Sequence, residues 1–193
     1  MIKLIPIFFV LLTLHSCKSQ QNISELENHF NKQQIDDLRK LTDFVITEVS
    51  QGKDFKSSLM NLDEEIANHG IEILLTRIDY QKQKEIIKSI DKSTYDEIWT
   101  KCLTQDFRRD IEYYVLCSNG PDFEYQKYLH ELGKRIPYVK EYAEKLTASG
   151  DLGHDFNFWY YYLSPEGPVN HSDFNAQLIF AIHILTLYDQ LNN

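Results

Sequence analysis

The sequence predicts an all-α fold, in the form of a single compact multi-helix domain. From residue 23 onward, apolar residues recur mostly at three- and four-residue steps, the spacing that places them on one face of a helix. Apolar residues make up 42% of the chain and aromatic residues 13%, which is typical of a folded protein. Nothing repeats at a fixed period and no low-complexity linker divides the chain, so we expect one domain.

The N-terminal half is expected to form a series of amphipathic helices. A long helix begins at Ile23 and ends near Gly52, and a shorter one follows over 55–62. Residues 71–78 contain enough β-branched side chains to permit a strand, but we favour a helix because no partner strand is evident. Asp79 then opens a helix with one isoleucine-rich face.

Two helices are predicted in the middle of the chain. The first covers 94–103 with Ser93 as its N-cap, and the second covers 107–117. Their apolar faces would carry Tyr95, Ile98, Trp99, Cys102, Ile111, Tyr114 and Val115.

Four helices follow in the C-terminal part, separated by Gly and Pro signals. They are expected over 122–132, 137–149, 156–163 and 173–191. The last is apolar on nearly every face and should lie at the centre of the bundle, since His183 and other polar residues interrupt it too often for a membrane span.

The N-terminus carries a leader ahead of this domain. Lys3 precedes an apolar run over 4–14, which is too short for a transmembrane helix and suits a secretory signal. The sequence Leu14-His15-Ser16-Cys17 resembles the lipobox of bacterial lipoproteins, although His15 is not the usual residue at its place. The resemblance implies a signal peptide over 1–16, a lipidated N-terminus and short tether over 17–22, and the helical domain over 23–193. An uncleaved N-terminal anchor is the alternative.

The same resemblance implies a location in the cell envelope. Acyl chains such as palmitate on Cys17 would anchor the protein to a membrane of the cell envelope. Lys18 stands where enterobacterial lipoproteins retained in the inner membrane carry Asp, so the outer membrane is favoured. The sequence does not indicate whether the protein lies on the inner or the outer face of the membrane.

The net charge restricts the classes of partner, and the cysteine content bears on the redox compartment. The net charge of −9 and the absence of a basic run argue against nucleic acid. With Cys17 committed to lipid, Cys102 and Cys117 form an even pair, which suggests a disulfide in an oxidising compartment. Two buried free thiols are the competing interpretation.

No strong catalytic motif is present, and no cofactor or metal is predicted. The sharpest polar cluster is His154, Asp155, His171 and Asp173, which could act as acid and base or ligate zinc if the turn between them brought them together. Base rates favour solvated loop residues, with both aspartates capping helices.

The aromatic segment 156–162 is the best candidate for a recognition surface. Tyr and Trp are favoured at binding hot spots, and one helical stripe cannot bury all of these rings. The candidates are Phe158, Trp159, Tyr161 and Tyr162, with burial in the core as the more favoured alternative.

The segments 93–99, 128–133, 147–151 and 181–187 are similar to uncharacterised lipoproteins of the Bacteroidota kind, a family that implies no activity. Our first hypothesis is a non-enzymatic, membrane-anchored module that binds a protein partner. One concrete form of it is an immunity-type inhibitor of a toxin. The alternatives are an envelope hydrolase that uses the His/Asp cluster, and a structural or assembly lipoprotein.

Overall fold

A computed structural model describes residues 23–192 except 71–72, 74–75, 107–109 and 151–155. The predicted leader, Cys17, His154 and Asp155 therefore lie outside the described residues, as does much of the helix predicted over 71–78. The elements run in the order α1 (Ser24–His29), α2 (Lys32–Ser50), α3 (Phe55–His69), α4 (Tyr80–Lys88), α5 (Lys92–Ile98), β1 (Trp99–Asp106), β2 (Ile111–Ser118), α6 (Glu124–Gly133), α7 (Pro137–Ser149), α8 (Phe156–Leu163) and α9 (Phe174–Asn192).

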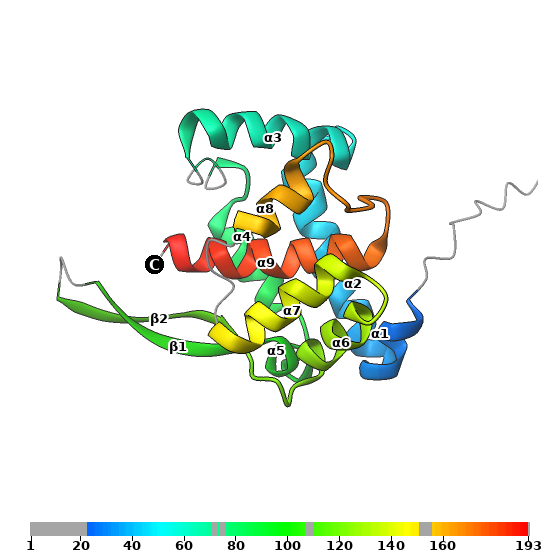
Figure 1. The fold of residues 1–193 in the computed structure, drawn as a ribbon. Coiled ribbons are helices and arrows are strands. Elements are labelled where there is room, and N and C mark those ends of the chain that lie inside the picture. The colour runs from blue at the N-terminus through cyan, green and yellow to red at the C-terminus, as the bar shows by residue number, and fades with distance from the viewer. Residues whose placement is uncertain (1–22, 71–72, 74–75, 107–109, 151–155, 193) are drawn as a thin grey trace, which may run out of the picture.

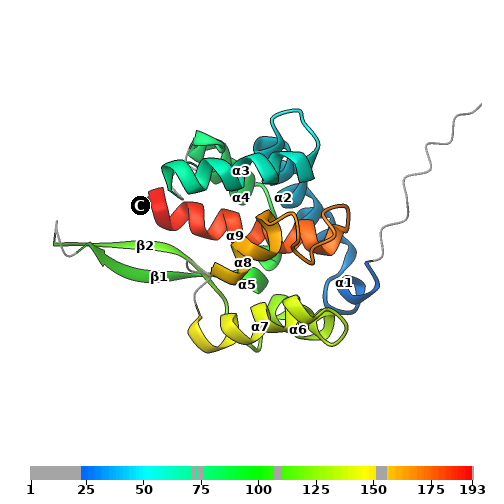
Figure 2. The ribbon, with the colours of Figure 1, turned by 45° about the horizontal axis from the view of Figure 1, so that its top comes forward.

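The fold is mainly helical, as predicted, and α9 lies at its centre. Every residue of α9 from Phe174 to Tyr188 except Gln177 is buried, which is what a helix with no polar face requires. Figures 1 and 2 both show α9 between α3 on one side and the α6–α7 pair on the other. The core is continuous, and α4 adds the partly buried Tyr80, Ile86 and Ile87 to buried residues of the other helices. No helix among the described residues is long and apolar enough to cross a bilayer.

The long helix predicted from Ile23 to Gly52 is divided in two. Phe30 and Asn31 have extended backbone, and the Asn31 side chain accepts a hydrogen bond from the Gln34 N–H at 3.1 Å. The Gln34 side chain in turn accepts from the Asn31 N–H at 3.0 Å, which completes a capping box. This reciprocal cap starts α2 afresh, and α2 then ends beside Gly52, as predicted.

The middle of the chain differs from the predicted structure. Helices were predicted over 94–103 and 107–117, but 99–106 and 111–118 form an antiparallel two-stranded hairpin. Only Lys92–Ile98 is helical there, and its N-cap is Asp91 instead of Ser93, because Asp91 accepts a hydrogen bond from the Ser93 N–H at 2.8 Å. The two strands are rich in Thr, Tyr, Ile and Val, which pack well on a pleated surface. The prediction of an all-α fold is therefore wrong at this hairpin.

The C-terminal helices follow the prediction. Pro137 stands at the start of α7, and Gly150 ends that helix in the left-handed region at φ 67°. The bounds of α8 and α9 agree with the predicted 156–163 and 173–191 to within one residue.

Candidate protein-binding site on the hairpin

The β1–β2 hairpin projects beyond the helical body. Figures 1 and 2 show it extending to one side, with α1 at the opposite end of the molecule. The base of the hairpin contacts α9 and α5, and the outer part has no helix against it in either view. The end of the described chain nearest Cys17 is therefore far from the projecting strands.

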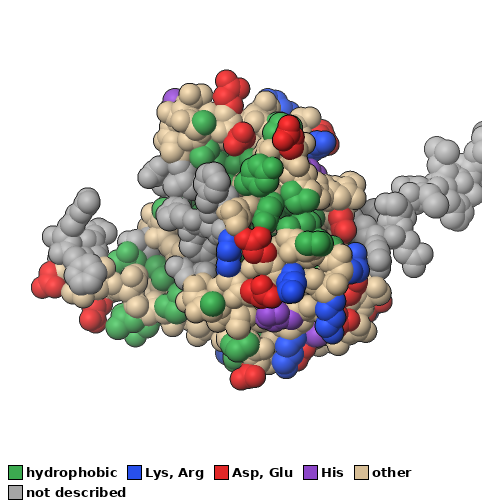
Figure 3. Space-filling model, viewed as in Figure 1, with side chains coloured by type: hydrophobic (Ala, Val, Ile, Leu, Met, Phe, Trp, Pro, Cys, Tyr) green, Lys and Arg blue, Asp and Glu red, His purple; other side chains and the backbone are tan. Residues whose placement is uncertain are grey.

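Large apolar side chains lie exposed on this outer part. Leu103 on β1 is 54% exposed and Tyr114 on β2 is 63% exposed. The two residues are directly opposite each other in the ladder, so their side chains lie together on one face. Ile111, on the other face, is 44% exposed. Figure 3 shows hydrophobic side chains along this arm and acidic side chains toward its end.

The base of the hairpin is fixed to α9 by side-chain hydrogen bonds. Trp99 is buried, and its indole Nε1–H donates to Thr186 Oγ1 at 2.7 Å. The Leu116 N–H donates to Asp189 Oδ2 at 2.8 Å, and Gln190 Nε2 donates to the Leu116 carbonyl at 3.0 Å. Burial, together with the Asp189 carboxylate, raises the pKa of the Tyr95 phenol, which lies against Trp99. These contacts hold the start of β1 and the end of β2 in a single orientation.

Cys102 and Cys117 lie on adjacent strands of the hairpin, as a disulfide would require. Their Cα atoms are 5.9 Å apart, within the range that a disulfide spans. In the ladder Cys102 lies opposite Val115, two residues from Cys117 on the same face. A bond between them would tie β1 to β2 next to the base.

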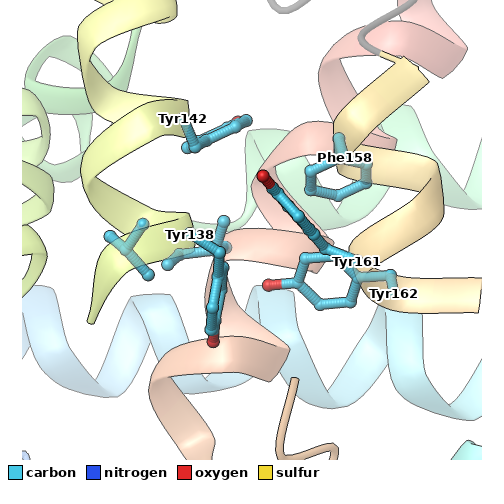
Figure 4. A pocket seen from close by; sticks show the side chains of 7 residues that line it. Tyr138, Tyr142, Phe158, Tyr161 and Tyr162 are labelled. Atoms are coloured by element: carbon cyan, nitrogen blue, oxygen red, sulfur yellow. The ribbon is translucent and has the colours of Figure 1, made fainter. Parts of the chain in front are cut away.

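The aromatic segment, for which burial in the core was favoured over a recognition surface, lies mostly in the core. Phe158 and Tyr162 are buried, and Trp159 and Tyr161 are half-buried. Figure 4 shows the rings of α8 and α7 converging on a cavity, whose volume of about 10 Å³ is comparable to one water molecule. It is far too small for a ligand, so the partly exposed rings offer no pocket.

The polar cluster predicted from the sequence is described only in part. His171 is buried, and its Nε2 donates to the Tyr162 carbonyl at 2.8 Å. Asp173 accepts from the Asn175 N–H at 2.9 Å at the start of α9, the capping role that base rates favoured. His171 also borders an open hollow of about 330 Å³ beside Asp54 and Lys56. Among the described residues, no group of three His, Cys, Asp or Glu side chains could hold a metal ion.

The exposed hairpin residues Leu103, Ile111 and Tyr114 were not predicted as a site. Tyr114 and Ile111 were placed on the buried face of a helix over 107–117, whereas the strand exposes both. Two runs rich in β-branched and aromatic residues, separated by a short polar stretch, were the signal that could have shown the hairpin.

Comparisons with protein-family models, curated proteins and solved structures find no match to this chain.

Proposed function

We propose that the protein is a lipid-anchored component of the bacterial cell envelope that binds another protein through its β-hairpin and is not an enzyme. One observation carries the proposal. Leu103 and Tyr114 form an exposed apolar pair on a hairpin whose base is fixed by α9, at the end of the molecule opposite α1.

The chemistry of the pair suits protein recognition. A tyrosine gives a large contact area together with a hydroxyl that can bond a partner, and Tyr is enriched at binding hot spots. Contiguous exposed apolar patches mark protein contact sites, whereas singly exposed apolar residues are ordinary. The fixed base also reduces the ordering entropy lost on binding.

The position of the anchor is compatible with this role. Cys17 precedes Ile23 by a tether that spans at most about 20 Å when fully extended. The tether would enter the fold at α1, so an acylated Cys17 would hold the body to the membrane at the end away from the hairpin. The outer membrane remains the favoured location, because Lys18 stands where lipoproteins retained in the inner membrane carry Asp.

An immunity-type inhibitor is one concrete form of such a module. The chain has a net charge of −9, which would favour association with a basic toxin. The hairpin contributes exposed Glu112 and Asp110 near its end.

Affinity capture from envelope fractions tests the hairpin. The wild-type chain should retain a protein partner, and the double variant Leu103→Ser/Tyr114→Ser should lose it. Tyr160→Ser is the matched control, because Tyr160 is also a large exposed side chain, 47% exposed, but lies on α8. Absence of a stoichiometric partner, or equal capture by the double variant, would contradict the proposal.

The anchor is tested separately with Cys17→Ser. We expect the variant to lose incorporation of labelled palmitate and to accumulate with its leader attached. A variant that is still processed and membrane-bound as before would overturn the lipoprotein assignment.

A further inference from the structure

The outer edge of β1 carries main-chain groups that point away from the hairpin. The Leu116 N–H and carbonyl bond to side chains of α9, so they are directed away from β1. Lys101 lies opposite Leu116, and residues directly opposite in an antiparallel ladder point their main-chain groups both inward or both outward. The outward groups of β1 therefore belong to Lys101 and, two and four residues on, to Leu103 and Gln105.

The two edges of the hairpin differ in how they are covered. On β2, the Asp189 and Gln190 side chains occupy the hydrogen-bonding positions that a third strand would take at Leu116. On β1, the main chain of Lys101, Leu103 and Gln105 forms no hydrogen bond outside the hairpin within the part of the chain that the structure describes. An uncovered strand edge with an exposed Leu at its middle is a template for pairing with another strand.

We propose that a second copy of this chain covers this edge. Its β1 would run antiparallel to the first β1 about a two-fold axis at Leu103, and the two hairpins would form one four-stranded sheet. This inference goes beyond the proposed function, which requires only one copy to present the hairpin. Two-stranded hairpins are marginally stable in water, and additional strands stabilise them.

The sequence of β1 is complementary to itself in this register. Leu103 would face the partner's Leu103, which buries apolar surface at the axis. Lys101 would face the partner's Gln105, so the arrangement opposes no like charges on that face. The three facing pairs are of the kind that exchange two main-chain hydrogen bonds each. A two-fold contact needs a single patch that fits itself, and this edge has that property.

The dimer would also enlarge the surface used in the proposed function. Tyr114 lies beside Leu103 on the same face, so the four strands would align Tyr114, Leu103, the partner's Leu103 and the partner's Tyr114 in one row. Because the two hairpins would point in opposite directions, each α1 would lie at an outer end of the dimer. Both tethers would then be clear of the sheet.

Cysteine cross-linking of the full chain, purified from membranes in detergent, tests the pairing. Residues opposite each other in a hydrogen-bonded pair have Cα atoms about 5.5 Å apart, which a disulfide spans. Leu103→Cys should therefore yield, on mild oxidation, a dimer joined through position 103 in both chains. Gln105→Cys is the matched control, since position 105 would face the partner's Lys101. We expect at least about tenfold less dimer from the control, because its two thiols would lie on opposite sides of the axis.

A charge variant gives an independent measurement. Leu103→Lys would set two ammonium groups opposite each other at the axis, and like charges directly opposite destabilise a sheet. The wild-type chain should sediment as a dimer and Leu103→Lys as a monomer. Equal cross-linking of the two cysteine variants, a monomeric wild-type chain, or a disulfide from position 103 to a different protein would each overturn the inference. Because these measurements use only the purified chain, they are independent of whether partner capture succeeds.

Discussion

Asp189, near the end of α9, accepts a hydrogen bond from the main-chain N–H of Leu116 on β2 at 2.8 Å. Its other carboxylate oxygen accepts from the Tyr80 hydroxyl at 3.1 Å, so one side chain connects α4, α9 and the hairpin. The residues are far apart in sequence, and the contact therefore depends on the complete fold. Together with the Trp99–Thr186 and Gln190–Leu116 hydrogen bonds, it fixes the base of the hairpin to α9.

Replacing this carboxylate should loosen the hairpin. In Asp189→Ala, the Leu116 N–H and the Tyr80 hydroxyl both lose an acceptor, and we expect the free energy of unfolding to fall by about 1–2 kcal/mol. Hydrogen exchange at the Leu116 amide should accelerate. Glu166→Ala, in the exposed turn after α8, is the control and should change neither quantity. Unchanged protection of Leu116 in Asp189→Ala would show that the hairpin is held by other contacts.

The predicted disulfide can be tested on the unreduced protein. If Cys102 and Cys117 are bonded, alkylation after denaturation without a reductant should modify neither. The Cys102→Ser/Cys117→Ser variant should then lose up to about 3 kcal/mol of unfolding free energy, the chain-entropy value for a loop of about 15 residues. Alkylation of both residues in the unreduced wild-type chain would establish them as free thiols.

Glu141 makes the stability of the α7–α8 contact dependent on pH. The Tyr161 hydroxyl, the Lys145 ammonium at 2.9 Å and the Asn157 amide hold the pKa of the Glu141 carboxyl at about 2, below its ordinary value of 4.5. A carboxyl whose pKa is lower in the folded state stabilises that state above its unfolded pKa and loses the effect as pH falls through its folded pKa.

We therefore expect Glu141→Gln to be less stable than wild type at neutral pH and equally stable near pH 2. The difference should be below about 1 kcal/mol, because 38% of the side chain is exposed and solvent screens the interaction. Denaturant unfolding across this pH range measures it. Glu144→Gln, on a more exposed glutamate of the same helix, is the control. A gap that does not close toward pH 2 would contradict the assignment.

The C-terminal helices could be predicted because local signals and tertiary packing agree there. Pro137 and Gly150 mark the ends of α7, and the apolar sequence of α9 matches its central position. The hairpin could not be predicted by periodicity, because Tyr95, Ile98, Trp99 and Cys102 fit a helical spacing that continues past the real end of α5. The strand is decided by pairing with β2 and by contacts with Asp189 and Thr186, which a local pattern does not contain.

The residues of the candidate site were also predictable from the sequence only in part. The cysteine pair was predicted from its even count, and the structure places the two residues 5.9 Å apart at Cα. The aromatic segment was the candidate recognition surface with burial as the favoured alternative, and Phe158 and Tyr162 are buried by α7 and α9. Aromatic content alone does not distinguish a core helix from a binding surface, since either uses the same side chains.

His29, at the end of the molecule nearest the tether, lies between two carboxylates. Its Nδ1 lies 2.9 Å from Glu124 and its Nε2 lies 2.8 Å from Glu131, so both ring nitrogens face carboxylates of α6. The His29 ring therefore connects α1 to α6.

His29→Phe should weaken this connection while keeping a ring beside Tyr128. Glu124 and Glu131 would each lose a hydrogen-bonding partner, so we expect the free energy of unfolding to fall. Buried Leu26 and Phe30 should keep α1 docked on average. Amide exchange over 27–30 should accelerate, with exchange in α9 unchanged. His69→Phe, on an exposed histidine at the end of α3, is the control. If exchange over 27–30 does not change in His29→Phe, apolar packing alone holds α1 to the body.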